Sequence, residues 1–243
     1  MSHNEKVGFV FLAGGGMSSW VWTDITAKIS LPLITPEYRL PENTEYARKM
    51  ATISDCSDYI IGLIEESKFE KAILVAHSGA GVIAANVAKI IPQRILHIVY
   101  IAASIPESGK SAVDSLPLPL RLLNKAAINS QVKRDFTPAK KSEKIIRKKF
   151  CNTCSEESIK YVLKQNLLSE PLCLAFEKSN WDGFPGVKQT YIILTKDETI
   201  SVSGQKKMMD HLSISSFLEI ESGHMVMLSH PEELAKVLNS IIG

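Results

Sequence analysis

The stretch AILVAHSGAGVIAANVA, residues 72–88, decides the fold of this chain. It opens with apolar residues typical of a buried strand and closes with a pattern typical of a helix. Between them, Ala76 and Ala80 flank Ser78 where the usual G-x-S-x-G pattern has glycine. Small residues at those positions let a strand turn tightly into a helix, and the turn exposes its central side chain. The stretch predicts a nucleophile at Ser78, with the Gly79 N–H placed to stabilise an oxyanion.

The alternation of strand and helix extends outward from this turn. Most of the expected strands are apolar nearly throughout, as parallel strands covered on both faces are. The sequence therefore predicts an α/β fold with a doubly wound, mainly parallel sheet of about six strands. Ser229, three residues before Glu232, predicts a capping box for the last helix. The expected strands are 7–12, 31–35, 72–76, 95–102, 190–195 and 215–220, and the expected helices are 20–29, 44–66, 79–91, 205–212 and 231–242.

The alternation breaks in the middle of the chain. Residues 104–187 hold six prolines and helical patterns at 142–150 and 155–168. We interpret this region as a helical cap insertion over the end of the sheet, with residues 1–103 and 188–243 forming the core. Eight Lys or Arg residues lie between 133 and 149, and we interpret them as a solvated face of the cap. Candidates to line an apolar pocket under the cap are Leu116, Leu118, Leu122 and Phe136.

Composition excludes several classes of protein. The 243 residues carry a net charge of +2, with 45% hydrophobic and 22% charged residues, which favours one globular unit over a disordered or fibrous chain. Such a charge gives no reason to expect nucleic acid as a partner. The polar N-terminus and the lack of a long apolar run predict a cytoplasmic protein without a membrane partner. Four cysteines are too few for a disulfide scaffold, and the lone pair Cys151-x-x-Cys154 lacks a second pair for zinc, so we expect reduced thiols.

A serine nucleophile needs a base and an acid, and two later loops offer them. His224 follows the expected strand at 215–220, and Asp197 follows the one at 190–195. Both loops fall at the carboxyl ends of parallel strands, where α/β sheets bind their ligands. Asp197 is preferred to its neighbour Glu198, and Asp182 is a remoter alternative because it lies in the insertion. We set His77 aside as the base because adjacent side chains in the turn diverge, and His3, His97, His211 and His230 because they lack such a loop.

Two other motifs compete with this interpretation. Gly14-x-Gly16, after the first strand, could begin a dinucleotide fingerprint with Glu37 as the ribose acid, but Ser19 stands where the third glycine belongs. The stretch from 104 to 111 ends in Gly-Lys-Ser like a phosphate-binding loop, but it starts with serine instead of glycine. Neither motif is complete, so we expect no nucleotide cofactor.

Several stretches of the chain resemble a known superfamily. They are FVFL at 9–12, SWVW at 19–22, AHS at 76–78, DETI at 197–200 with Gln205, and HMVMLSHPEEL at 224–234. The chain resembles α/β-hydrolases, in the branch that holds plant methylesterases and hydroxynitrile lyases. The resemblance implies that Gly15 supplies a second oxyanion amide. The chain departs from the family pattern at Ala13, where the family usually has His, and at Gly79-Ala80-Gly81, where it has Leu-Gly-Gly.

The sequence thus predicts hydrolysis of a small, mainly apolar carboxylic ester through an acyl-enzyme. Ser78 would be the nucleophile, His224 the base and Asp197 the acid that orients it. We expect a small-molecule ester as the substrate, no nucleic-acid or membrane partner, and neither a metal nor an organic cofactor. A lactonase, a lyase, a cofactor-free dioxygenase and a non-catalytic receptor remain alternatives. The resemblance implies that a lyase needs Thr and Lys at the positions of Gly14 and Met225.

Overall fold

A six-stranded parallel sheet forms the centre of the molecule. The computed structural model describes residues 6–37, 52–115, 118–119, 121–122, 126, 141–165 and 172–241. The strand order is β2-β1-β3-β4-β5-β6, and every neighbouring pair is parallel. The predicted doubly wound α/β fold is therefore confirmed. The strands are β1 (Val7–Leu12), β2 (Leu33–Ile34), β3 (Lys71–His77), β4 (Ile95–Ile101), β5 (Lys188–Leu194) and β6 (Phe217–Ile220).

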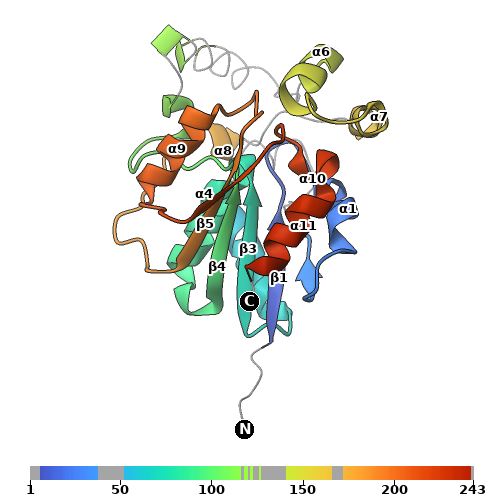
Figure 1. Ribbon diagram of the computed structural model, residues 1–243. Coiled ribbons are helices and arrows are strands. Elements are labelled where there is room, and N and C mark those ends of the chain that lie inside the picture. The colour runs from blue at the N-terminus through green and yellow to red at the C-terminus, as the bar shows by residue number, and fades with distance from the viewer. Residues whose placement is uncertain are drawn as a thin grey trace.

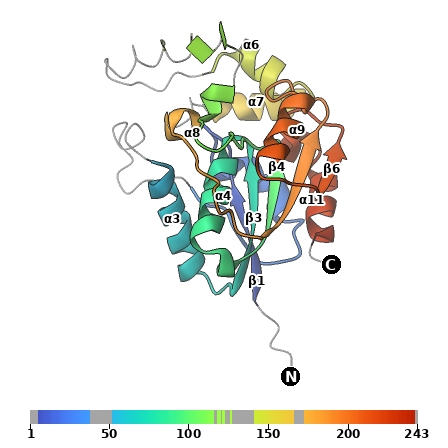
Figure 2. The ribbon, with the colours of Figure 1, turned by 90° about the vertical axis from the view of Figure 1, so that its left-hand side faces the viewer.

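Helices cover both faces of this sheet. Alternate residues of β3 point to opposite sides, so Leu74 joins one buried cluster and Ile73 joins the other. The first cluster packs beneath α3 (Ile53–Glu66), α4 (Gly81–Ile90) and α9 (Val202–His211). The second packs beneath α1 (Thr23–Thr26), α10 (Val226–Ser229) and α11 (Pro231–Ser240). Figure 2 shows α3 and α4 on one side of the sheet and α11 on the other.

Helix caps account for several of the boundaries. Thr52 and Asp55 form a reciprocal capping box at the start of α3. The expected helix at 44–66 therefore begins later, and its residues 44–51 lie outside the described part of the chain. The capping box expected at Ser229 is wrong. His230 is the N-cap of α11, and the Ser229 hydroxyl instead bonds the Ser222 hydroxyl at 2.8 Å.

Helices of the central region lie above the carboxyl end of the sheet (Figure 1). They are α6 (Glu143–Ile145), which runs into a π-helical turn (Ile146–Phe150), α7 (Glu156–Lys164) and α8 (Leu172–Phe176). Of the expected pocket residues, Leu118 and Leu122 are each 59% exposed, whereas Leu116 and Phe136 lie outside the described residues. That these four residues line a pocket, and that the cap spans 104–187, stay predictions.

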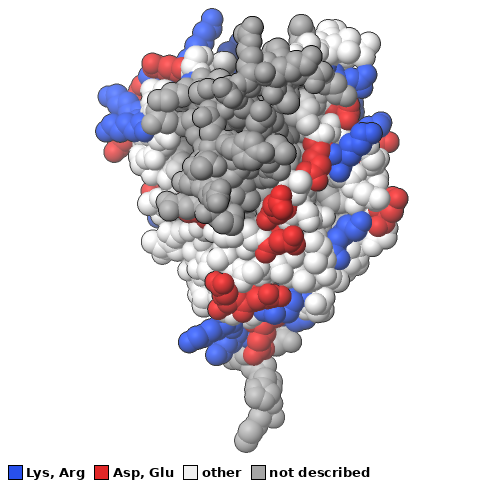
Figure 3. All heavy atoms as spheres, turned by 180° about the vertical axis from the view of Figure 1, so that it is seen from behind, with Lys and Arg blue, Asp and Glu red and all other residues white. Residues whose placement is uncertain are grey.

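The described surface is mixed in charge. On the face turned away from the viewer in Figure 1, Lys and Arg side chains are interspersed with Asp and Glu side chains (Figure 3). Ion pairs such as Lys28–Glu232 and Arg147–Glu156 are exposed and contribute little to stability. Within the residues that the structure describes, no helix is long and apolar enough to cross a membrane.

Candidate active site

Ser78 stands at the sharp turn between β3 and α4. Its φ of +52° lies in the left-handed region, which a residue with a side chain adopts only under local strain. Ala76 and Ala80 are fully buried on either side of it. The turn also needs Gly81, because a Cβ there would lie 2.6 Å from the backbone oxygen of Ser104. The expected strained turn from strand to helix is therefore present.

Asp197 is fixed in one orientation by the backbone of its own loop. Its Oδ1 accepts hydrogen bonds from the N–H groups of Thr199 at 2.6 Å and Ile200 at 3.0 Å. Its Oδ2 lies 2.7 Å from Nδ1 of His224, and both side chains are fully buried. The carboxylate therefore presents one oxygen to its own loop and the other to the histidine.

His224 connects this carboxylate to the serine. β5 and β6 are adjacent and parallel, so the loops after them meet at one end of the sheet, as the positions of Asp197 and His224 require. The Nε2 of His224 lies 3.0 Å from Ser78 Oγ. A neutral imidazole that donates from Nδ1 to Asp197 has an acceptor free at Nε2 for the serine proton. The structure thus brings together the three residues that the sequence singled out.

His77 contacts His224 but is not itself the candidate base. Its Nε2 lies 2.9 Å from the backbone oxygen of His224, and the two imidazole rings are 4.6 Å apart. Burial, with a smaller effect of His224, holds the pKa of His77 well below its usual range. His77 thus stays neutral and adds no second positive charge beside His224. The sequence indicated that His77 is not the base, but it gave no signal for this contact.

The glycine loop after β1 packs against the same turn. A Cβ on Gly14 would lie 2.8 Å from Ser78 Cβ and 3.0 Å from His77 Nδ1, so only glycine fits there. Gly15 and Gly79 are both buried in this region. A turn closed by the Met17 N–H on the Gly14 oxygen, at 3.1 Å, shapes the loop. Gly15 and Gly79 remain the candidates for the two oxyanion amides.

The competing carboxylates have other partners. Glu198 is half exposed and pairs with Lys149 at 3.5 Å, and Asp182 accepts from the Ser108 hydroxyl at 3.1 Å. Glu37, the candidate ribose acid, binds the backbone N–H and hydroxyl of Ser19. These contacts leave Asp197 as the carboxylate in contact with the base.

The remaining histidines of the described chain also have local roles. His97 lies 3.0 Å from the Thr190 hydroxyl, His211 2.6 Å from the Ile105 backbone oxygen and His230 2.9 Å from the Ser229 hydroxyl. His3 lies outside the described residues. Among the residues that are described, no three His, Cys, Asp or Glu side chains gather where they could hold a metal ion.

Comparison with known proteins gives the family. A model described as an alpha/beta hydrolase family matches residues 9–237. The chain belongs to this alpha/beta hydrolase family. Curated relatives include an alpha-hydroxynitrile lyase of Arabidopsis thaliana, 25% identical over 256 residues, with 98% of this chain and 97% of the relative covered. Salicylic acid-binding protein 2 of Nicotiana tabacum is 26% identical over 259 residues, again with 98% and 97% covered.

Solved structures agree with this fold. An extracellular alpha/beta-hydrolase from a Paenibacillus species superposes with a TM-score of 0.82 at 22% identity, covering 96% of this chain and 98% of the other. Polyneuridine aldehyde esterase superposes with a TM-score of 0.76 at 20% identity, covering 98% and 100%. At these identities the likeness shows the fold alone. The predicted resemblance to the branch of plant methylesterases and hydroxynitrile lyases is confirmed by the curated relatives.

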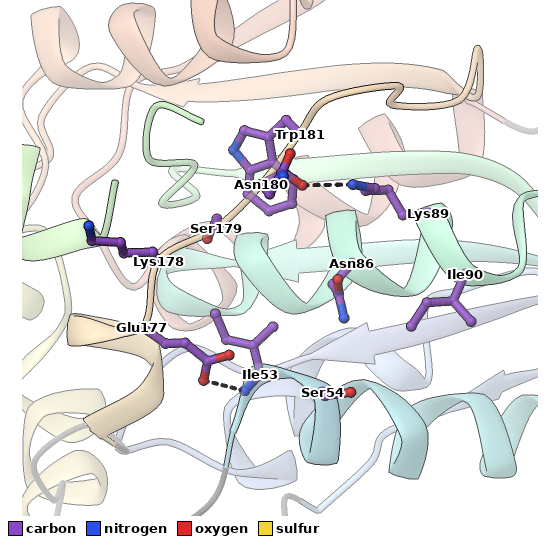
Figure 4. Close-up of a pocket in the computed structure, with 10 residues that line it drawn as sticks. All are labelled: Ile53, Ser54, Asn86, Lys89, Ile90, Glu177, Lys178, Ser179, Asn180 and Trp181. Atoms are coloured by element: carbon purple, nitrogen blue, oxygen red, sulfur yellow. Dashed lines mark hydrogen bonds between the residues drawn. The ribbon is translucent and has the colours of Figure 1, made fainter. Parts of the chain in front are cut away.

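The protein also has a hollow of about 280 Å³ on the side of α3 and α4. Figure 4 shows that polar contacts cross it, with Lys89 Nζ donating to the Asn180 oxygen at 2.9 Å and Glu177 accepting from the Ile53 N–H at 2.8 Å. Its lining includes none of Ser78, Asp197 and His224. The hollow is therefore separate from the candidate active site.

Proposed function

We propose that the protein is a serine hydrolase that cleaves a small, mainly apolar carboxylic ester. The observation that carries this proposal is the line of contacts from Asp197 through His224 to Ser78, with 2.7 Å at the first step and 3.0 Å at the second. A serine hydroxyl is a weak nucleophile until an adjacent base removes its proton. An oriented imidazole within hydrogen-bond reach of the hydroxyl meets that requirement.

In the proposed reaction Ser78 Oγ attacks the ester carbonyl while its proton passes to His224 Nε2. The imidazolium that forms is stabilised by the Asp197 carboxylate through Nδ1–H. The amides of Gly79 and Gly15 stabilise the oxyanion of the tetrahedral intermediate. His224 then gives its proton to the leaving alcohol, which leaves an acyl group on Ser78. A water molecule that loses its proton to His224 hydrolyses this ester and restores the serine.

The surroundings of the imidazole favour this cycle. His77 is kept neutral by burial, so it does not oppose the positive charge that His224 gains at each proton transfer. The Phe150 and His224 rings meet in a T-shaped arrangement, with centroids 5.5 Å apart. An apolar, buried setting strengthens the pairing of the imidazolium with Asp197.

The curated relatives support an ester as the substrate class. They include methylesterase 7 of Arabidopsis thaliana and polyneuridine aldehyde esterase of Rauvolfia serpentina, each 24% identical over 265 residues. We propose a small, mainly apolar ester and not a peptide, because the candidate pocket residues under the proposed cap are apolar. We propose no metal or organic cofactor, since the three side chains and two amides complete the reaction.

Lyase chemistry is the second candidate, because a hydroxynitrile lyase is among the relatives. The resemblance implies that such lyases use Thr in the oxyanion loop and Lys after the histidine. This chain has Gly14 at the first position, with no room for a Cβ, and the buried Met225 at the second. These two residues favour the hydrolase over the lyase.

A panel of p-nitrophenyl and methyl esters, with a cyanohydrin added, tests the proposal. We expect the wild type to hydrolyse short apolar esters and Ser78→Ala to lose at least ~10³-fold in kcat, because the nucleophile is gone. Ser203→Ala, which changes an exposed serine on α9, is the matched control and should keep the wild-type rate. Cyanohydrin cleavage without ester hydrolysis would favour the lyase, and an active Ser78→Ala protein would contradict the proposed nucleophile.

A further inference from the structure

The turn between the π-helical segment and α7 carries two cysteines. Its four residues are Cys151, Asn152, Thr153 and Cys154, and the Cys154 N–H donates to the Cys151 oxygen at 3.0 Å. Cys151 is buried, whereas Cys154 is partly exposed. From the sequence alone we expect this pair to be two reduced thiols.

The two residues between the cysteines hold the two loops of the candidate active site. Asn152 Nδ2 donates to the Lys196 backbone oxygen at 2.8 Å, and Thr153 Oγ1 accepts from the Gly223 N–H at 2.8 Å. Lys196 directly precedes Asp197, and Gly223 directly precedes His224. The turn therefore bridges the loop of the acid to the loop of the base, and we call residues 151–154 the clamp turn.

The approach of the clamp turn to the base is close. A Cβ on Gly223 would lie 2.2 Å from Asn152 Oδ1 and 3.0 Å from Thr153 Oγ1, so the contact exists only because residue 223 is glycine. The residue before the clamp turn adds a further contact, since the Phe150 oxygen accepts from the Met225 N–H at 3.2 Å. The backbone on both sides of His224 is thus held by this one segment. A displacement of the clamp turn therefore moves the backbone that carries the His224 imidazole.

The two thiols of the clamp turn are in contact. A hydrogen bond from the Cys154 thiol lowers the pKa of Cys151, against the opposing effect of burial and with a smaller contribution from the Arg147 guanidinium. The same contact, together with burial, raises the pKa of Cys154, so Cys151 is the thiol that ionises first. A β-turn brings the Cα atoms of its first and last residues within about 7 Å, and disulfides span Cα separations of about 4.4–6.8 Å. The turn geometry therefore permits a disulfide without unfolding α7.

We propose that Cys151 and Cys154 form a modification site, at which a low-molecular-weight disulfide such as glutathione disulfide oxidises the clamp turn and slows the reaction at Ser78. One protein thiolate attacks glutathione disulfide, and the first glutathione leaves. The second protein thiolate attacks the protein sulfur of the mixed disulfide, and the second glutathione leaves. Two protein thiols are oxidised, one glutathione disulfide is reduced to two glutathiones, and the two protons end on the glutathione thiols.

Oxidation slows the reaction because the clamp turn has to change shape. Two sulfurs joined by a hydrogen bond must close to about 2.05 Å to bond, and Asn152 and Thr153 lie between them. Asn152 holds the loop of the acid, and Thr153 holds the loop of the base, each through one hydrogen bond. A misplacement of about 1 Å in an active site costs up to roughly 100-fold in rate. We expect kcat to fall by at least about tenfold and to change more than KM, because both contacts go to the loops of the acid and the base.

The chain supplies its own control pair. Cys56 on α3 and Cys173 on α8 also share a thiol hydrogen bond, but both are buried. Neither belongs to a loop that carries Asp197 or His224. Cys154 is partly exposed and neither control thiol is, so we expect a small oxidant to reach the clamp turn more readily than the control pair.

The test incubates the intact protein in glutathione buffers of increasing oxidised fraction, maps disulfides by peptide mass spectrometry and measures ester hydrolysis. We expect a Cys151–Cys154 disulfide, a fall in kcat that tracks its fraction, and full recovery with dithiothreitol. Cys154→Ser should lose the response and Cys173→Ser should keep it, each rate being referred to the same variant in its reduced form. In reduced protein, Thr153→Val should lower kcat with KM unchanged, and Thr153→Ser should restore it because the hydroxyl acceptor returns.

The effect on rate rests on the proposed ester hydrolysis, so the site has a readout that needs no ester. Formation of the disulfide should shift the imidazole ¹⁵N resonances of His224, and reduction should reverse the shift. A protein that hydrolyses no ester but shows this shift contradicts the proposed function and leaves the modification site intact. The modification site is overturned by any of three results. They are no Cys151–Cys154 disulfide in excess glutathione disulfide, a disulfide that changes neither kcat nor the His224 resonances, and a response that persists in Cys154→Ser.

Discussion

Replacing Asp197 with asparagine is expected to preserve the fold and remove most of the catalytic rate. Oδ1 of Asp197 accepts two backbone N–H groups, so the oxygen of the new amide must occupy that position. The NH₂ group is then left facing Nδ1 of His224, where Oδ2 now accepts. His224 can only accept from this group, so its proton moves to Nε2. The imidazole then holds the wrong tautomer and has no free acceptor for the Ser78 proton.

The same substitution in a serine protease triad lowers kcat about 10⁴-fold, which is about 5 kcal/mol of transition-state stabilisation. Steady-state hydrolysis of the best ester of the panel measures the effect, with circular dichroism as the check of folding. Glu198→Gln is the matched control, because Glu198 is half exposed and pairs with Lys149, and it should stay within about twofold of wild type. A crippled Glu198→Gln with a nearly normal Asp197→Asn would refute the assignment of the acid.

Two further predictions concern stability. Gly81→Ala should lower the free energy of unfolding by about 1–3 kcal/mol, because the new Cβ would lie 2.6 Å from the Ser104 backbone oxygen. Gly62→Ala, whose Cβ would have no atom within 4 Å, should raise the free energy of unfolding by about 0.5–1 kcal/mol. Urea titrations of both variants measure the difference, and equal effects would contradict the packing argument. Burial, with a smaller effect of Lys188, lowers the pKa of His97 to about 4. As the pH falls below about 6.5, His97 is therefore protonated in the unfolded chain but stays neutral in the folded protein, which lowers the free energy of unfolding. The wild type should therefore lose roughly 2 kcal/mol more between pH 7.5 and pH 5 than His97→Asn does, and parallel pH curves would count against a neutral, buried His97.

Much of this fold follows from local sequence patterns. Each expected strand overlaps one of the six in the sheet. The four inner strands are predictable because they are covered on both faces and are apolar nearly throughout, whereas the edge strand β6 exposes three of its four residues. The turn at Ser78 was predictable for a similar reason, since Ala76, Ala80 and Gly81 leave few other ways for the chain to continue. Asp197 and His224 were found because a parallel sheet brings the loops at the carboxyl ends of adjacent strands together.

Contacts between distant segments were not predictable in this way. The His77 ring against His224 and the clamp turn across two loops depend on how far the loops bend, which no local pattern encodes. The capping box expected at Ser229 failed for a related reason. The pattern was present, but the Ser222 hydroxyl, brought near by the loop after β6, bonds Ser229 instead. A tertiary contact thus overrode a local preference.

Covalent labelling with a fluorophosphonate tests the central claim most directly, because the reagent reacts with a serine that a base has activated and not with one that is merely exposed. Mass spectrometry of the digested protein locates the adduct. We expect one phosphonyl group on Ser78 of the folded wild type, slower labelling of Asp197→Asn and none of Ser78→Ala or of the denatured chain. An intact protein that carries no adduct, or that carries it on another residue, would contradict the assignment of Ser78 as the activated nucleophile.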